Sequence, residues 1–370
     1  MNDIPKTGWL TLFLDQFFKE NDDLYFIHEI SAFSQTNTSI SIPEKLRAWV
    51  RLRYYDSKIV YGLIPQWNAE FLQEFDHHDR QFFSLLRLVA QISFESGYIL
   101  GYRIDDSLMA RLDFLYICAS FLNEQRMMSH CQSLFLETDE LKKIKKIHHI
   151  EIKIGNLFIK HFCIRTLPLL GLSLKNGLLF SNLRSFVNLS HLYFEHKAIS
   201  KDKLLAIHNF AEKEKKLLIE ALVSLAGRRH NIEQEDKTRF IQTIMQAGLS
   251  KSEAKTLLSS LNTPKTPQEL AQNIRDSRIK HFILTQTLLN YFLDEGHDSL
   301  DLTLVTHLSI GLKIPKDSYL RLYSEVKQVW EQHHNAFIAE AMGVSHSRVS
   351  PKLVRIIEKS VGENWHALLN

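Results

Sequence analysis

The distribution of proline and glycine is the feature that most limits what this chain can fold into. Its 370 residues include only 8 prolines and 13 glycines, and the stretches 66–167 and 169–263 contain no proline. Because proline lacks a backbone N–H and clashes with the preceding helical turn, long proline-free stretches suit helices. Sandwiches of β-strands and dinucleotide-binding folds need more turn residues. We therefore expect an all-α protein, and its length favours two helical bundles.

Composition and charge narrow the class of protein further. Hydrophobic residues make up 45% of the chain and charged residues 24%, which is typical of a globular protein. The net charge of +3 is too small to indicate a nucleic-acid-binding protein. The odd set of Cys118, Cys131 and Cys163, without metal-binding spacing, indicates reduced thiols. The N-terminus lacks a signal-peptide pattern and no stretch has the roughly 18–20 apolar residues of a membrane span, so we expect a cytoplasmic protein.

An aromatic stripe marks the N-terminal segment 8–19. Trp9, Phe13 and Phe17 recur there at helical spacing, which predicts an amphipathic helix. Such a stripe has two interpretations. It packs onto a protein core, or it lies in a membrane interface and contacts lipid through these three side chains.

The second half of the chain aligns with itself at an offset of 65 residues. Phe240 falls on Val305 and Leu257 on Leu322, and both copies have the pattern of a helix–loop–helix–helix unit. Between the copies, Thr266 is followed by Pro267 and Glu269, which predicts a helix start with a capping box. We therefore divide the chain into a first module at 1–200, a duplicated helical bundle at 201–335 and a helical tail at 336–370.

Each copy contains an acidic loop after an apolar helix. The carboxylates are Glu233 and Asp236 in the first loop, and Asp294, Asp298 and Asp301 in the second. Oxygen-rich loops of this kind bind hard cations such as Ca²⁺. The alternative is that these residues only cap the neighbouring helices.

Residues 205–330, with these paired loops, resemble the TerB family of tellurite-resistance proteins. The family's loops have the form Asp-Gly-x-Ile followed by acids. In this chain Arg229 and His230 take the place of the first Asp-Gly, and only Asn231-Ile232-Glu233 follows. The resemblance implies a helical bacterial module connected with envelope or stress processes.

Two segments of the first module are similar to the EcsC family, over residues about 80–195. One is Gly97-Tyr98 with the stretch 101–106, GYRIDD, before an apolar helix. The other combines the stretch 165–171, RTLPLLG, with Asn176-Gly177, Asn182 and Tyr193-Phe194. The resemblance implies an all-helical bacterial module that is often associated with membranes.

Motifs for known catalytic chemistry do not occur in the sequence. It has no phosphate-binding loop, no nucleophile elbow and no His-Glu-x-x-His. The strongest enzymatic alternative is a hydrolase whose polar pocket lies in the first module. Its candidate residues are Asp105, Asp106, His161, Asn176 and Asn182.

A third alternative is a DNA-binding regulator. The segment 337–357 resembles a helix-turn-helix, in which Arg348, Lys352 and Arg355 would face the major groove. Pro351 falls inside that recognition helix and would bend it. We favour instead a non-catalytic interaction or scaffold protein of the bacterial cytoplasm with protein partners and no organic cofactor. The resemblances add the inner-membrane surface as a second partner.

Overall fold

The structure is a computed structural model that describes residues 9–20, 25–55, 58–64, 67, 72–73, 77–103, 105, 107–162, 171–226, 241, 244–245, 249–259, 263–293 and 299–344. Within these ranges the chain forms 14 α-helices and no strands. The all-α class expected from the proline and glycine distribution is confirmed.

The helices occupy the following residues, with the π-helical turn η1 and the 3₁₀ turn η2 after the third helix: α1 Trp9–Glu20, α2 Tyr25–Thr36, α3 Ile42–Val50, η1 Arg51–Tyr55, η2 Lys58–Tyr61, α4 His77–Ile99, α5 Leu108–Phe121, α6 Gln125–Phe135, α7 Glu140–Phe162, α8 Gly171–His196, α9 Lys201–Ala226, α11 Lys251–Ser259, α12 Pro267–Asn273, α13 Ser277–Leu293, α14 Ser299–Gly311 and α15 Lys316–Val344.

Helix α5 lies at the centre of the first half. Every residue from Ala110 to Phe121 is buried, so this helix is apolar nearly all round, as expected of a helix enclosed by others. A chain of ring contacts crosses it. The ring centroids of Phe94 and Phe114 are 5.6 Å apart, and those of Phe114 and Phe186 are 6.3 Å apart. These aromatic pairs join α4, α5 and α8 into one core.

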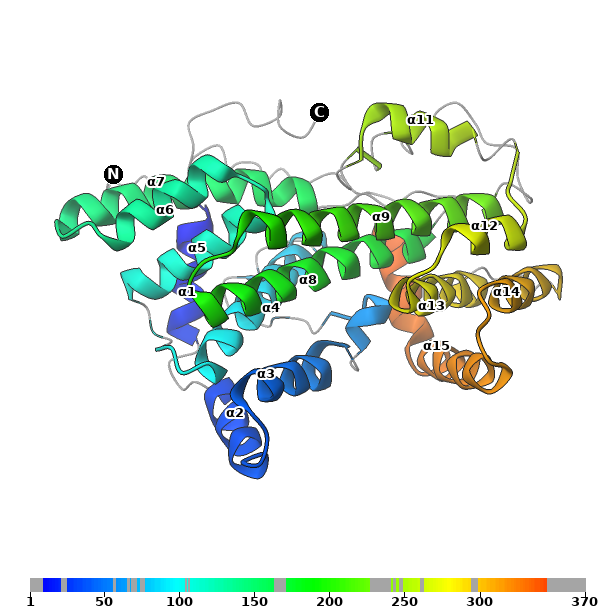
Figure 1. Cartoon of the computed structure of the whole chain (residues 1–370), viewed down its shortest axis with the longest axis horizontal. Helices are drawn as coiled ribbons and strands as arrows, with labels where there is room; N and C mark the ends of the chain where they lie inside the picture. Colours follow the sequence, from blue (N-terminus) through cyan, green and yellow to red (C-terminus); the bar gives the residue numbers. More distant parts are fainter. Residues whose placement is uncertain are drawn as a thin grey trace.

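Helix α8 connects the two halves of the molecule. It packs against α4 and α5, and also against α9 and α13, and it runs beside α9 along the long axis (Figure 1). Gly177 allows the close approach of α9, because a Cβ atom there would meet the Leu218 side chain at 2.4 Å. Small residues inside helices often mark such close helix–helix contacts.

The N-terminal helix is part of this core. The side chains of Phe13 and Phe17 are only 1% and 0% exposed, and Phe17 stacks on Phe94 with 5.6 Å between ring centroids. In this conformation Phe13 and Phe17 are core residues, covered by α7 and by rings such as Phe94 of α4. Membrane contact through α1 stays a prediction, which this burial disfavours. The side chain of Trp9 lies outside what the structure describes.

The predicted boundary near residue 200 falls in the turn between α8 and α9. One cluster of buried residues runs across it, from Leu10 to Val326. The division into modules stays a prediction. The duplication of the second half is not shown, and residues 227–240 of its first copy lie outside the described ranges. The predicted helix start at Thr266 is confirmed, since its hydroxyl accepts the Glu269 N–H and Pro267 begins the helix.

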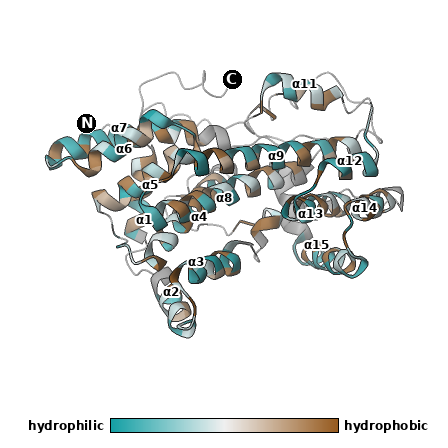
Figure 2. Ribbon diagram, viewed as in Figure 1, coloured by the Kyte–Doolittle hydropathy of each residue, from teal (hydrophilic) through white to brown (hydrophobic). Residues whose placement is uncertain are grey.

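Hydrophobic and hydrophilic residues share each helix in Figure 2. Among the described helices, none combines the length and the hydropathy that crossing a membrane requires. Cys118 and Cys131 are buried free thiols, and burial raises the pKa of the Cys118 thiol well above its usual value. Cys163 lies outside the described ranges.

Candidate functional site

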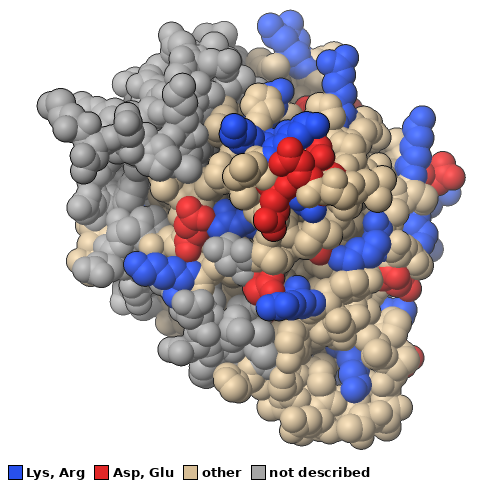
Figure 3. All heavy atoms as spheres, turned by 90° about the vertical axis from the view of Figure 1, so that its left-hand side faces the viewer, with Lys and Arg blue, Asp and Glu red and all other residues tan. Residues whose placement is uncertain are grey.

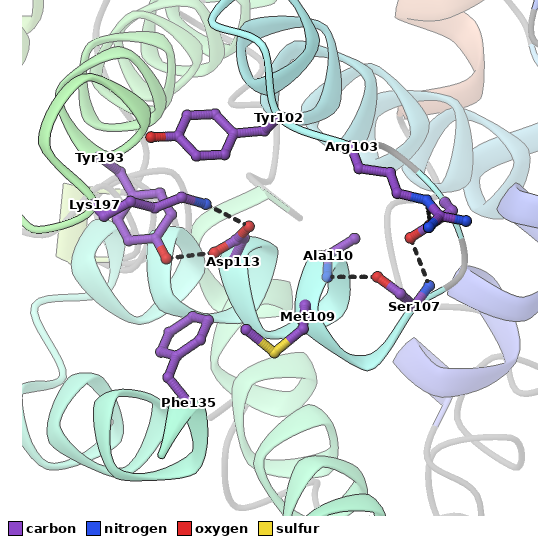
Figure 4. A pocket seen from close by; sticks show the side chains of 10 residues that line it. Tyr102, Arg103, Ser107, Met109, Ala110, Asp113, Phe135, Tyr193 and Lys197 are labelled. Atoms are coloured by element: carbon purple, nitrogen blue, oxygen red, sulfur yellow. Dashed lines mark hydrogen bonds and ion pairs between the residues drawn. The ribbon is translucent and has the colours of Figure 1, made fainter. Parts of the chain in front are cut away.

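A cavity of about 690 Å³ opens at the N-terminal end of α5. It lies between α5, α6, the end of α8 and the segment 100–107 that joins α4 to α5 (Figure 4). Its lining residues are Tyr102, Arg103, Asp105, Ser107, Met109, Ala110, Asp113, Phe135, Tyr193 and Lys197.

The segment after α4 is shaped by its own backbone hydrogen bonds. The Tyr102 N–H donates to the Gly97 carbonyl at 2.9 Å, and Gly101 has a φ of +87°, a left-handed conformation that glycine adopts without strain. Ser107 then caps α5 by accepting the Ala110 N–H at 3.2 Å. With these bonds in place, Tyr102, Arg103 and Ser107 line the cavity.

Asp113 is the buried acid of the site. Its side chain comes from the second turn of α5, and one carboxylate oxygen accepts the Tyr193 hydroxyl at 2.5 Å. The other oxygen is 2.7 Å from Nζ of Lys197. Both partners come from the last turn of α8 and the residue after it. Charge-assisted bonds of this kind are stronger than neutral ones, so they tie α5 to the end of α8.

Lys197 sits in an aromatic enclosure. Its Nζ atom lies 3.8 Å from the ring centroid of Tyr102, 4.9 Å from that of Phe194 and 5.2 Å from that of Tyr193. Figure 4 shows its side chain reaching toward Asp113 beside the rings of Tyr102 and Tyr193. Each distance is within the range in which a ring attracts a cation electrostatically. The ammonium group is therefore held by one carboxylate and three rings.

The pKa of Tyr193 is raised strongly. Burial of the phenol is the main cause, and the negative charge and hydrogen bond of Asp113 add to it. The hydroxyl therefore keeps its proton and remains a donor to Asp113. The Tyr193 ring packs on the Tyr116 ring, with 4.8 Å between their centroids. This contact holds the Tyr193 ring in place.

The rest of the cavity is apolar, with a polar rim. Met109 is 44% exposed, and Phe135 of α6 packs partly buried against the core. At the rim, the Arg103 guanidinium pairs with Asp105, while Asp105 accepts the Ser107 N–H at 3.1 Å. An apolar interior with a few fixed polar groups is typical of sites that bind a ligand or a partner's side chain.

The arrangement favours binding over catalysis. Nucleophilic catalysis needs a nucleophile within hydrogen-bond reach of a base that is free to take its proton. Among the described lining residues, Asp113 and Asp105 are both engaged by cations. The hydroxyl of Ser107 is a helix cap. The charges of the site are thus matched within the site.

The residues predicted for a hydrolase do not converge here. Asp105 lines the cavity, but Asn176 and Asn182 do not. On α8 they precede Tyr193 by 17 and 11 residues, which corresponds to about 25 and 16 Å along a helix. Asn176 instead donates to the Tyr61 carbonyl at 2.9 Å. The two asparagines therefore do not share this cavity with Asp105, and the hydrolase alternative stays a prediction. Asp106 and the His161 side chain lie outside the described part of the chain.

The remaining predicted sites fall on parts of the chain that the structure does not describe. These are the metal candidates Glu233, Asp236, Asp294, Asp298 and the side chain of Asp301, and the DNA candidates Arg348, Lys352 and Arg355. Within the described ranges, no group of three His, Cys, Asp or Glu side chains is arranged to hold a metal ion.

Sequence reasoning singled out only part of the cavity. The two segments that carry the EcsC resemblance contain Tyr102, Arg103, Asp105 and Tyr193. Asp113 and Lys197 were not among the residues predicted from the sequence. The signal for Asp113 was present, because it is a lone acid inside the apolar run 108–122. Lys197 carries no such signal.

Comparisons of this chain with known protein families, with curated proteins and with solved structures find no match.

Proposed function

We propose that this protein is a non-catalytic binding protein that recognises a partner protein through the cavity between α5, α6, the end of α8 and the segment 100–107. One observation carries the proposal. Two stretches about 90 residues apart, 101–106 and 193–194, both carry the resemblance to EcsC proteins, and residues from both line the same open cavity.

The chemistry of the surroundings supports a protein partner. Exposed apolar side chains line and flank the cavity: Met109 in its lining is 44% exposed, and Leu136, which follows the lining residue Phe135, is 85% exposed. In Figure 3, which shows this end of the molecule, acidic side chains lie among the basic ones. Apolar and aromatic groups inside a mixed polar rim are the usual composition of a protein-recognition patch.

The process in which the protein acts is a separate part of the proposal. Envelope or stress-related work at the bacterial inner membrane rests on the resemblance to EcsC and TerB proteins alone. The burial of Phe13 and Phe17 disfavours α1 as the reason for membrane contact. A protein partner of the cavity needs no contribution from α1.

Site-specific photocrosslinking in producing cells tests the proposal. A benzophenone amino acid replaces Met109 at the cavity, and in a matched control replaces Leu320, which is 50% exposed on α15. We expect a discrete protein adduct from position 109 and none from position 320. The purified partner should bind the wild-type chain. It should bind the Met109→Trp variant at least tenfold more weakly, and the Leu320→Trp variant with unchanged affinity. No adduct at position 109, or equal adducts at both positions, would overturn the proposal.

A further inference from the structure

The walls of the Lys197 enclosure are held in place without help from Lys197. The Tyr193 hydroxyl is bonded to Asp113 at 2.5 Å. The ring of Phe194 contacts that of Tyr102 at 5.4 Å and that of Tyr193 at 5.2 Å between centroids. We call this set of four residues (Tyr102, Asp113, Tyr193 and Phe194) the cation cage. Since its members contact one another, the cage keeps its shape if the lysine leaves.

Lys197 is able to leave. Its side chain is 37% exposed, although Asp113 as a whole is only 7% exposed. It is anchored just after the end of α8 and reaches the cage through a flexible stem of four carbons. Rotation about that stem moves the ammonium group into the open cavity and to water without any change of the helices.

A buried carboxylate surrounded by aromatic rings is costly without a cation. Removing Lys197 leaves the Asp113 carboxylate with the Tyr193 hydroxyl and the water of the open cavity, and the surrounding rings keep it less hydrated than a surface carboxylate. The empty cage therefore attracts a cation of the right size. The group that fits is already seen in place, an ammonium at the end of an alkyl chain.

We infer that the cation cage is a receptor for an alkylammonium group, that Lys197 is its resident occupant, and that a lysine side chain of the partner protein displaces it. This inference rests on the proposed function, because the partner supplies the incoming lysine. Lys197 competes for the cage at a high effective concentration, because it belongs to the same chain. The partner overcomes this advantage by filling the apolar part of the cavity, beside Met109 and Phe135, at the same time.

The test uses the full chain with Lys197→Ala, which empties the cage, and n-butylammonium as the probe, which copies the end of a lysine side chain. We expect calorimetric titration to show the probe binding the variant at least tenfold more tightly than the wild type. It should also raise the variant's thermal midpoint by more than it raises that of the wild type. Equal concentrations of 1-butanol, which has the chain without the charge, should do neither.

Two further variants separate the cage from general effects. Lys201→Ala removes an exposed lysine near the same end of the molecule and should behave as the wild type. Lys197→Ala combined with Asp113→Asn removes the buried charge, so this double variant should fold well and fail to bind n-butylammonium. Equal affinity of the wild type and Lys197→Ala, or undiminished binding by the double variant, would overturn the inference.

This failure differs from failure of the proposed function. If Lys197→Ala shows no preference for n-butylammonium while a protein adduct still forms at position 109, the cavity binds a partner by other contacts, and only the cage inference is wrong. If the amine binds as expected but no adduct forms at position 109, the cage takes a cation that is not a partner's lysine. The displacement by a partner is then wrong together with the proposed function.

Discussion

Helix α5 buries two charges of opposite sign, two residues apart. Arg111 is 6% exposed and Asp113 is 7% exposed, and a separation of two residues places them about 200° apart around the helix. Arg111 pairs with Asp15 of α1 and with Glu151 of α7. Asp113 pairs with Tyr193 and Lys197 at the end of α8. The same helix therefore uses one buried charge on each side.

The partners, rather than the burial of the two charges, distinguish the sides. Glu151 is fully buried at 0% exposed, and its other bond comes from the buried Thr11 hydroxyl. The Arg111 side connects three helices, and its second counterion, Asp15, has a side chain that is 53% exposed. On the other side, the Lys197 side chain is 37% exposed and borders a cavity. Since each side has a counterion that reaches water, the cavity beside Lys197 is what marks this open side as a binding site.

The largest expected effect is on the Arg111 side. Arg111→Met keeps most of the side-chain volume and leaves Glu151 without its buried counterion. Breaking a buried pair in this way costs about 3–5 kcal/mol, so we expect a loss of this size in the free energy of unfolding, measured by urea denaturation. Arg126→Met, which changes an exposed arginine on α6, is the matched control and should change little. A loss below about 1 kcal/mol for Arg111→Met would show that the pair is not the connection described here.

The next effect is a pH dependence of the same connection. Burial raises the pKa of Glu151, and this outweighs the opposing effects of the Thr11 hydrogen bond and the Arg111 charge. The folded state therefore holds the proton more tightly than the unfolded state. The resulting stabilisation is complete below the unfolded pKa, near 4.5, and is lost as the pH rises through the folded pKa.

Glu151→Gln cannot ionise and lacks this dependence. We expect the wild type to lose stability relative to Glu151→Gln as the pH rises above about 4.5, by about 1.4 kcal/mol for each unit by which the pKa is raised. Paired urea titrations between pH 4 and pH 8 measure the difference. Glu137 provides a control of opposite sign, because its hydrogen bond with Lys146 lowers its pKa. The wild type should therefore become more stable relative to Glu137→Gln as the pH rises over the same range. Parallel curves for wild type and Glu151→Gln would contradict the assignment.

The contrast between the two sides of α5 also shows what the sequence can predict. The scarcity of proline and glycine predicts helices, and Thr266 with Glu269 predicts a helix start, because both are local properties of the chain. The apolar run 108–122 predicts a buried helix for the same reason. Local signals do not predict which residues far apart in the sequence contact each other. The pairing of Asp113 with Lys197 spans 84 residues, and nothing near either residue encodes it.

The N-terminal helix shows the same limit. Its stripe of Phe13 and Phe17 records that one face is apolar, and an apolar face has the same pattern whether protein or lipid covers it. Only the tertiary structure shows what covers this face, here through the contact of Phe17 with Phe94. The segments 101–106 and 193–194 were found by their resemblance to a family. The cavity that joins them depends on how α4, α5 and α8 pack.

The smallest expected effect is on the open side. Tyr193→Phe removes one hydrogen bond to Asp113 and keeps the ring, which still packs on Tyr116. Asp113 retains Lys197, so no charge is left alone, and we expect a loss of about 1 kcal/mol in the free energy of unfolding. The raised pKa of Tyr193 keeps its hydroxyl protonated, so this loss should be constant between pH 6 and pH 9. Combined with Lys197→Ala, the phenylalanine ring should preserve n-butylammonium binding within a few fold. A loss as large as that of Arg111→Met would mean that both sides of α5 are structural connections, and the cavity beside Lys197 would no longer identify the binding site.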